Sequence, residues 1–460
     1  MVLTIPLLHK YNVSAGKSLI RTPLRYINVA VFCYAAWERE GNKPYMRGIV
    51  IFDLDGTLLC THHHILQAAK DTLRAFGLPD VSDETIIQQI GETSDVFCNA
   101  IAPGCADMER FKAQFRINER VALRTHGKLF DGIRTVLSML AAEGFRLMVC
   151  SAASLDYIEL ALTTTGIKDI FHTVISSKGF AGKGEAIAKE HFTQCDNVIM
   201  VGDRLHDYIA ASENQIPSVA ALYGYGSADE ISLASFTAET PEDIHTRILQ
   251  ITLYTQIYSK IKCKSNVRCV GVNGVDTSGK SVFASRFASF LKSKGQHAVV
   301  IHLDDFHNPV ATRRKGSNEI EAYINNAFDI NTLVEQLLLP IRNTGRVTKT
   351  LKLLDLDSDT YTLKNHYDIR QDTLVLLEGV LLYRSPIEDL IDFKIFLDIS
   401  FEEVAKRASV RDVPKYGIQI LDKYQEKYIP IQQWYLQTHN PKGKSDVVVD
   451  NSDFKNPFIL

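Results

Sequence analysis

Two series of short apolar segments, each alternating with helical segments, limit the fold of this chain more than any other feature. Short apolar strands separated by helices are typical of a parallel, doubly wound sheet. The alternation loosens at about residue 240 and restarts at about residue 267, which predicts an α/β protein with two such sheets. The expected strands are 47–52, 146–150, 174–176, 198–201 and 218–222 in the first series, and 267–272, 297–303, 374–377, 393–397 and 446–449 in the second.

The length of 460 residues also requires more than one domain, because single hydrophobic cores do not grow to that size. The expected parts are a domain over 46–248 with a helical cap at about 61–126, a linker over 249–265, and a domain over 266–460. Residues 1–45 contain no acid before Glu38, as in a transit peptide. We expect instead a disordered extension, or a mis-assigned start with Met46 as the true beginning.

Composition narrows the classes of partner. With 51 basic and 54 acidic residues, the net charge of −3 argues against a nucleic-acid coat or a membrane-surface protein. The apolar stretch near the start, 29–37, is about half as long as a membrane span. Eight cysteines without a C-x-x-C pair indicate reduced thiols and a cytoplasmic location. Homo-oligomers are compatible with these features.

The first candidate site begins with two aspartates that follow the first strand. Asp53 and Asp55 lie where open α/β sheets place their ligands, at the carboxyl end of a strand. One carboxylate can attack phosphorus and form an aspartyl-phosphate, and a carboxyl two residues on can protonate the leaving group. The pair therefore predicts hydrolysis of a phosphate ester.

Later strand ends supply the remaining groups of this site. Ser151 offers a hydroxyl and a backbone N–H to the phosphoryl group, and Lys183 can neutralise charge shared by phosphate and nucleophile. Asp203 and Asp207 offer the oxygen ligands that Mg²⁺ prefers. Any one aspartate could merely cap a helix or a turn, but the ordered set favours catalysis.

These motifs, Asp53-Leu-Asp-Gly-Thr57, Ser151, Lys183 and Gly202-Asp-Arg-Leu-His-Asp207, resemble those of the haloacid dehalogenase superfamily of phosphatases over about 46–240. The resemblance implies a Rossmann-like core with a helical cap. It also implies Asp53 as nucleophile, Asp55 as general acid, and Asp53, Asp55 (through its carbonyl) and Asp203 as Mg²⁺ ligands. Segment 220–226 is similar to the phosphoglycolate phosphatase and pyrophosphatase branch.

Two further features lie at the start of the expected cap. Cys60 stands where many relatives carry an acid, which bears on substrate contacts at the cap. The consecutive histidines His62, His63 and His64 do not share one helix face. We therefore expect them at a solvated or substrate-facing entry to the cap rather than in a metal site.

The second candidate site is a glycine-rich loop. The pattern G-x-x-x-x-G-K-S follows an apolar strand and precedes a helix over 282–291, which is the context that this motif requires. Such a loop wraps phosphates with its backbone N–H groups at a helix N-terminus, while its lysine adds charge and its serine can ligate Mg²⁺. The candidate ATP-binding residues are Gly274, Ser278, Gly279, Lys280 and Ser281.

Acids and arginines farther along indicate what the bound nucleotide is used for. Asp304 follows the second strand of this series and suits the base that deprotonates an acceptor hydroxyl, with a possible Mg²⁺ contact. Glu378 ends the third strand near the expected Mg²⁺. Arg407 and Arg411, four residues apart on one helix face, could clamp the transferring phosphate from a lid, although a solvated face explains such a pair equally well.

The segment from about 267 to the end resembles the uridine kinase family of P-loop kinases, which includes relatives of phosphoribulokinase and pantothenate kinase. The resemblance rests on the P-loop, Asp-Asp-Phe-His at 304–307, Glu-Gly at 378–379 and Arg-x-x-x-Arg-Asp at 407–412. By that likeness Asp304 is the acceptor base, Ser281 and Glu378 complete the Mg²⁺ site, and the arginines belong to a lid. Tyr323 replaces an aspartate that holds ribose hydroxyls in true uridine kinases.

Together the two sites predict a bifunctional enzyme of small-metabolite metabolism. Its first half would hydrolyse a small phosphate ester with Mg²⁺, and its second half would phosphorylate a small-molecule hydroxyl, uridine-like or related, with ATP. The alternative is a nucleotide-sensing regulatory protein in which one domain is catalytically silent. That alternative requires degenerate catalytic positions, and the sequence keeps every core position named above.

Overall fold

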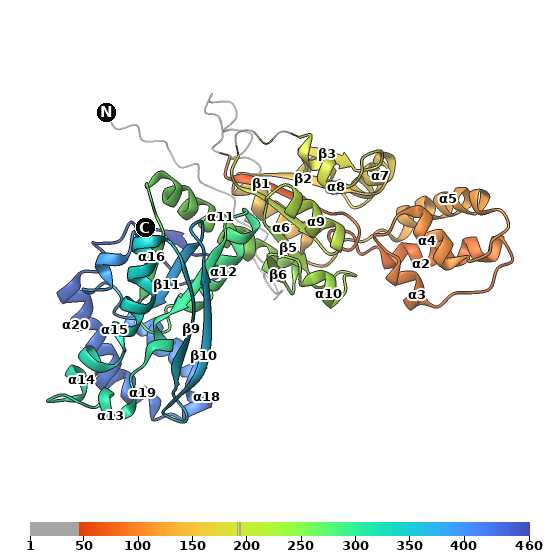
Figure 1. Cartoon of the computed structure of the whole chain (residues 1–460). Helices are drawn as coiled ribbons and strands as arrows, with labels where there is room; N and C mark the ends of the chain where they lie inside the picture. Colours follow the sequence, from red (N-terminus) through yellow and green to blue (C-terminus); the bar gives the residue numbers. More distant parts are fainter. Residues whose placement is uncertain (1–45, 191, 193–194) are drawn as a thin grey trace, which may run out of the picture. The chain divides into compact units, whose positions relative to one another are not determined.

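The computed structural model describes residues 46–190, 192 and 195–460, so the expected extension 1–45 lies outside the described residues. This described part contains two six-stranded sheets, one two-stranded ribbon and the helices that connect their strands (Figure 1). Both large sheets are predominantly parallel and flanked by helices, which confirms the predicted α/β class with two doubly wound sheets. Within these ranges, no helix combines the length and the apolar character needed to cross a membrane.

The first sheet has the order β3-β2-β1-β4-β5-β6, and all its strands are parallel. The central strand β1 is buried along its whole length, as expected for a sheet covered on both faces. The short edge strand β6 was not predicted. The elements are β1 (Gly48–Phe52), α6 (Ile133–Ala142), β2 (Phe145–Ser151), α7 (Leu155–Thr164), β3 (Thr173–Ser176), α8 (Lys183–Ala188), β4 (Val198–Gly202), α9 (Leu205–Glu213), β5 (Ser218–Ala221), α10 (Ala228–Ile231) and β6 (Phe236–Ala238).

Four helices occupy the stretch in which a helical cap was expected. They are α2 (His62–Ala75), α3 (Asp83–Gln88), α4 (Ser94–Ile101) and α5 (Met108–His126). The side chains of Ser82, Thr93 and Asp107 accept backbone N–H groups at three of the helix starts, which explains where these helices begin. Apolar side chains of the four helices form a hydrophobic cluster of their own, so this insertion has its own small core.

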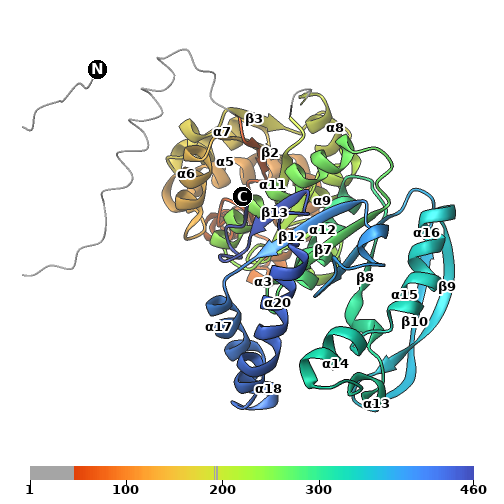
Figure 2. The same ribbon diagram turned by 90° about the vertical axis from the view of Figure 1, so that its left-hand side faces the viewer.

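The second sheet has the order β14-β13-β12-β7-β11-β8, with β14 antiparallel to its neighbour. Figure 2 labels its strands β13, β12, β7 and β8. Its strands are β7 (Cys269–Gly274), β8 (Ala298–His302), β11 (Leu374–Gly379), β12 (Phe393–Asp398), β13 (Val447–Asp450) and β14 (Phe458–Ile459). The hairpin of β9 (Val347–Asp355) and β10 (Thr360–Ile369) was not predicted. The helices are α12 (Lys280–Ser293), α13 (Val310–Arg313), α14 (Glu319–Asn326), α15 (Ile330–Leu333), α16 (Leu339–Thr344), α17 (Phe401–Arg411), α18 (Val413–Tyr416), α19 (Ile420–Lys423) and α20 (Ile429–His439).

Helix α11 (Pro241–Cys263) occupies most of the segment that the sequence assigned to a linker over 249–265. Thr240 and Asp243 form a capping box at its start. Apolar residues lie on all sides of this helix, which is typical of a buried helix. The Tyr254 ring packs against the rings of Phe283 and Phe287 on α12, at 5.2 and 5.5 Å between centroids. The connection is therefore a core helix.

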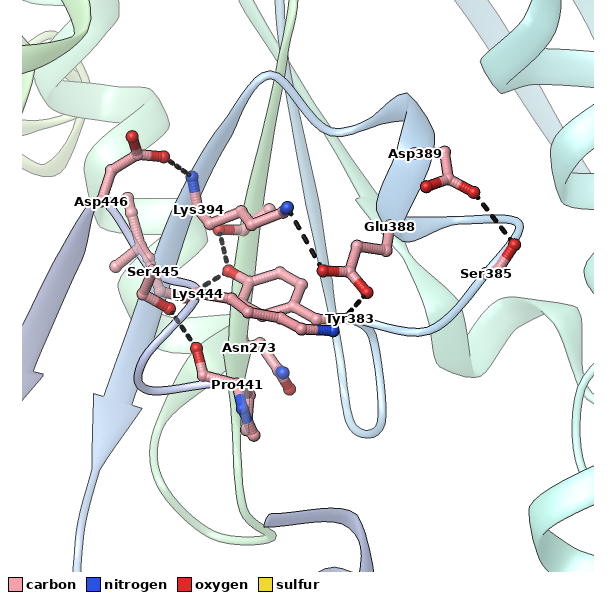
Figure 3. A network of polar contacts seen from close by, with 12 residues as sticks. Asn273, Tyr383, Ser385, Glu388, Asp389, Lys394, Pro441, Lys444, Ser445 and Asp446 are labelled. Atoms are coloured by element: carbon pink, nitrogen blue, oxygen red, sulfur yellow. Dashed lines mark hydrogen bonds and ion pairs between the residues drawn. The ribbon is translucent and has the colours of Figure 1, made fainter. Parts of the chain in front are cut away.

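A polar network braces the central strands of the second sheet (Figure 3). The Tyr383 hydroxyl lies 2.9 Å from the carbonyl oxygen of Gly271 on β7 and 2.7 Å from that of Ile395 on β12. Nearby, the Lys394 backbone N–H donates to a carboxylate oxygen of Asp446 at 2.8 Å. These contacts fix the strand that leads into the glycine-rich loop.

Candidate active sites

A lysine held between two carboxylates forms the centre of the first site. The Nζ atom of Lys183 lies 2.7 Å from Oδ1 of Asp53 and 2.7 Å from Oδ1 of Asp207, and all three side chains are buried. Burial raises the pKa of Asp53, and the charge of Asp207 adds to this effect. Burial alone would lower the pKa of Lys183, but the two carboxylates outweigh it and raise that pKa. The lysine therefore stays charged beside the predicted nucleophile.

The turn after β1 helps to hold a third aspartate, Asp203, at the first site. The Thr57 hydroxyl donates to Oδ1 of Asp203 at 2.9 Å, and the Tyr225 backbone N–H donates to Oδ2 at 2.8 Å. Burial raises the pKa of Asp203 to about 7. Gly56 has φ +84°, and a Cβ atom there would lie 2.2 Å from Oδ2 of Asp203. The motif requires glycine at this position for both reasons.

Three of these carboxylates have the chemistry of a cation site. One ligand atom from each of Asp53, Asp203 and Asp207 lies within 4.8 Å of the others. Three buried carboxylates share one lysine, so the local charge is negative when all are ionised, and burial penalises that state. A hard divalent cation such as Mg²⁺ fits an all-oxygen donor set of this kind. The predicted ligands Asp53, Asp203 and Asp207 thus come together.

The Asp55 carboxylate does not belong to that group within the described residues. Its Oδ1 atom accepts hydrogen bonds from the Thr61 hydroxyl at 2.7 Å and the Tyr157 hydroxyl at 3.1 Å. Burial raises the pKa of Asp55, which favours a protonated carboxyl. Ser151 lies buried at the end of β2, where its hydroxyl accepts the backbone N–H of Ala153 at 3.1 Å.

The inserted segment makes further contacts with the core that sequence reasoning missed. Burial raises the pKa of Glu119 on α5 to about 8, and the nearby Asp55 carboxylate adds to this effect. Arg204, which follows Asp203, pairs with Glu92 of the insertion at 2.9 Å. These contacts join residues more than 60 positions apart, so no local pattern could reveal them.

The three consecutive histidines divide into two environments. His62 and His63 lie near Cys60, with one possible ligand atom of each within 4.8 Å of the others. The His62 ring lies 3.1 Å from the Tyr225 hydroxyl. His64 is instead fully buried beside Tyr157, so it does not lie at the solvated entry expected from sequence.

The glycine-rich loop of the second site connects β7 to α12. Gly279 has φ +89° immediately before the first helical residue, Lys280, whose Nζ atom donates to the carbonyl oxygen of Val275 at 2.9 Å. The Ser278 hydroxyl is buried without a hydrogen-bond partner among the described residues. At Gly274 a Cβ atom would lie 2.5 Å from this hydroxyl oxygen. A loop of this shape and an unsatisfied polar atom fit a phosphate-binding cradle.

Predicted Mg²⁺ contacts of the second site also meet. The Ser281 hydroxyl donates to Oε1 of Glu378 at 2.9 Å, and Nδ1 of His302 lies 2.6 Å from the same oxygen. Burial alone would raise the pKa of Glu378, but these hydrogen bonds and the Lys280 charge lower it. Asp304 is exposed at the end of β8. Its charge contributes, after burial, to the raised pKa of Asp276 in the loop, which places Asp304 near the cradle.

The two arginines that the sequence assigns to a lid are bound to protein groups. The Arg407 guanidinium donates to Glu403 at 2.9 Å, to the Thr277 carbonyl at 3.2 Å and to the Asn451 carbonyl at 2.7 Å. It therefore braces the glycine-rich loop. Arg411 forms a two-pronged pair with Asp412, at 2.8 and 2.9 Å.

A group of aromatic side chains lies near the cradle. Tyr323 contacts Phe328 and Tyr428, with ring centroids 6.2 and 6.0 Å apart. Burial raises the pKa of Tyr323, and the charges of Asp276 and Asp304 add to this. Tyr323 therefore occupies this position as a neutral phenol. Tyr428 and Asp276 were not among the predicted site residues.

Comparison with known proteins gives a separate result for each half. Residues 50–221 match the family of haloacid dehalogenase-like hydrolases, and residues 269–443 match the phosphoribulokinase/uridine kinase family. The chain therefore joins a haloacid dehalogenase-like domain to a uridine kinase-like P-loop domain. Both of the matched families consist of enzymes.

Individual relatives cover one half each. A phosphoglycolate phosphatase of Colwellia psychrerythraea is 26% identical over 205 residues, which is 41% of this chain and 91% of the relative. The tyrosine-protein kinase PtkA of Mycobacterium tuberculosis is 29% identical over 206 residues, 44% of this chain and 69% of PtkA.

Solved structures divide in the same way. One, described as a predicted phosphatase from Clostridium acetobutylicum, is 24% identical with a TM-score of 0.39, and the match covers 45% of this chain and 99% of that chain. Another, described as a possible uridine kinase from Bacillus stearothermophilus, is 24% identical with a TM-score of 0.35. The match covers 44% of this chain and 97% of that chain.

Proposed function

We propose that this chain is a bifunctional cytoplasmic enzyme that hydrolyses a small phosphate ester in its first half and phosphorylates a small-molecule hydroxyl with ATP in its second half. The observation that carries the proposal is the Asp53–Lys183–Asp207 cluster, with Asp203 beside it. Such a buried group of acids around one lysine is costly for stability alone and is suited to phosphoryl chemistry.

In the first half, Asp53 attacks phosphorus while the bond from phosphorus to the ester oxygen breaks, and an aspartyl-phosphate forms. The protonated Asp55 gives its proton to the leaving oxygen, and the resulting carboxylate then takes a proton from the water that hydrolyses the intermediate. Lys183 holds the nucleophile in place. Mg²⁺, held by Asp53, Asp203 and Asp207, would offset charge on the phosphoryl oxygens.

In the second half, the loop from Gly274 to Ser281 binds the phosphates of ATP. The Lys280 ammonium leaves the Val275 carbonyl oxygen and binds these phosphates instead. Asp304 takes the proton of the acceptor hydroxyl as that oxygen bonds to the γ-phosphorus, while the bond from the γ-phosphorus to the bridging oxygen breaks and ADP leaves. Ser281 and Glu378 would hold Mg²⁺, which offsets charge on the transferring phosphate. The aromatic group around Tyr323 favours an acceptor with a flat apolar ring, such as a nucleoside.

The proposal is tested by two screens of the full-length chain with Mg²⁺. The first measures phosphate release from phosphoglycolate, pyrophosphate, sugar phosphates and nucleotides, with and without EDTA. The second measures ADP formation from ATP with nucleosides, sugars and vitamins. We expect one ester class and one acceptor class to react. Metal-independent hydrolysis, or ATP hydrolysis that no acceptor accelerates, would contradict the respective half of the proposal.

A further inference from the structure

A chain of buried hydrogen bonds leads from the insertion into the first site. Nε2 of His64 on α2 lies 3.1 Å from the Tyr157 hydroxyl on α7, which donates to Oδ1 of Asp55 at 3.1 Å. His64 is 0% and Tyr157 5% exposed. The other ring nitrogen of His64, Nδ1, is buried with no partner among the described residues.

The direction of each hydrogen bond follows from the number of protons. A tyrosine hydroxyl carries one hydrogen, and here it points to Asp55, so it can only accept from His64. His64 must therefore be the neutral tautomer with its proton on Nε2. Burial lowers the pKa of His64 to about 4, which agrees with a neutral ring at neutral pH.

The same reasoning locates the proton of Asp55. Its Oδ1 atom accepts two hydrogen bonds, from Thr61 and from Tyr157. A carboxyl oxygen that accepts two donors has no lone pair left for a proton, so the acidic hydrogen has to reside on Oδ2.

We propose that His64 and Tyr157 are positioning residues that lock Asp55 with its transferable proton on Oδ2. This inference rests on the proposed phosphatase function, in which Asp55 protonates the leaving oxygen. His64 and Tyr157 do not touch the substrate. Their effect is to keep Oδ1 as an acceptor and to keep the carboxyl from turning.

Proton transfer matters only for leaving groups that depart poorly as anions. A p-nitrophenolate ion leaves readily without a proton, whereas the oxygen of benzyl alcohol needs one. Loss of the lock should therefore slow benzyl phosphate hydrolysis much more than p-nitrophenyl phosphate hydrolysis. A defect in folding or in substrate binding would slow both probes together. Glu119 and Lys183 also act on Asp55, and they are unchanged in every variant below.

The experiment compares kcat/KM for the two probes in the full-length chain with Mg²⁺. The variants are Tyr157→Phe, which removes one hydroxyl, His64→Leu, which removes the donor, and His64→Gln, which restores an N–H donor. Tyr254→Phe, in the buried helix α11, is the matched control for loss of a hydroxyl.

We expect Tyr157→Phe to lower the benzyl-to-nitrophenyl ratio by about tenfold or more. His64→Leu should lower the ratio in the same direction, His64→Gln should restore it, and Tyr254→Phe should leave it unchanged. An unchanged ratio in Tyr157→Phe and His64→Leu overturns the inference, even where both rates fall. If the unaltered chain hydrolyses neither these probes nor any ester of the phosphate-release screen, the proposed phosphatase function itself fails.

Discussion

The two sites of this chain hold their charges in different ways. In the first, Lys183, Asp53 and Asp207 are buried and paired with one another, so the reacting groups already lie in contact. In the second, backbone surrounds the phosphate position, Asp304 is exposed, and Arg411 is paired with its neighbour Asp412. The first site is therefore organised before substrate binds, whereas in the second the proposed ATP would have to draw charged side chains away from protein partners.

This difference has an energetic consequence. Removing one partner of a buried ion pair leaves an uncompensated charge, at a cost of about 3–5 kcal/mol. Pairs near the surface contribute about 0–1 kcal/mol. Substitutions in the first site should therefore change both stability and activity, whereas those in the second should change mainly activity.

The largest expected effect is that of Lys183→Met. Phosphate release should fall by about 10³-fold or more, because the cation between nucleophile and phosphate is lost. The melting temperature should fall too, since Asp53 and Asp207 are left unpaired. Steady-state assays and thermal melts check both. Lys189→Met, an exposed lysine on the same segment, is the control and should change neither. A Lys183→Met chain that keeps its activity would contradict this account of the first site.

The next effect concerns the acceptor base. Asp304→Asn should slow phosphoryl transfer by about 10²-fold or more, because an amide cannot take the hydroxyl proton. ATP binding by calorimetry and the melting temperature should both be retained. Asp305→Asn is the matched control, because that carboxylate already accepts from Asn365 at 3.0 Å. Equal losses in the two variants would make Asp304 a structural acid.

The arginines should separate charge stabilisation from structure. Arg411→Ala should lower the turnover of the kinase by about 10²-fold with little change in the KM for ATP, because its charge acts on the transferring phosphate. Arg407→Ala should instead raise the KM for ATP, because the Thr277 carbonyl loses its brace. The same change of KM and turnover in both variants would show that neither acts as a lid residue.

The smallest expected effect is a pH dependence of stability. Asp203, with a pKa of about 7 in the folded protein, has a pKa above its unfolded value. Its protonated form is thus favoured by folding, and that contribution is lost as pH rises through about 7. In EDTA the melting temperature should fall as pH rises from about 5 to about 7 and should level off above that, and Mg²⁺ should reduce the fall. Asp203→Asn should have a smaller fall, because Asp53, Asp55 and Glu119 keep their raised pKa values. A fall of unchanged size in Asp203→Asn would assign it to these other groups.

Much of both sites could be predicted because parallel strands bring their carboxyl ends to one edge of a sheet. That rule placed Asp53, Lys183 and Asp203 in one cluster, and the P-loop pattern placed Ser281 near Glu378. Each of these groups follows a strand that can be recognised in the sequence as a short apolar run. Local sequence was sufficient there.

Other parts depend on contacts that spacing does not contain. The link from His64 to Tyr157 joins helices 93 positions apart, and the Arg407 contact with Thr277 spans 130. The hairpin β9–β10 carries many exposed polar residues, so its strands lack an apolar run. The sequence assigns most of helix α11 to a linker because the helix ends in a basic stretch, which is typical of an exposed segment. The structure shows that the middle of the helix is apolar and buried.

The central claim is that one chain contains two independent phosphoryl-transfer sites. The most direct test measures both activities in Asp53→Asn and Lys280→Ala, prepared full length alongside the unaltered chain. We predict that Asp53→Asn loses phosphate release by about 10³-fold or more and keeps ATP-dependent transfer, while Lys280→Ala shows the reverse pattern. If either substitution abolished both activities in a folded chain, or if neither affected its own, the assignment of two separate sites would be contradicted.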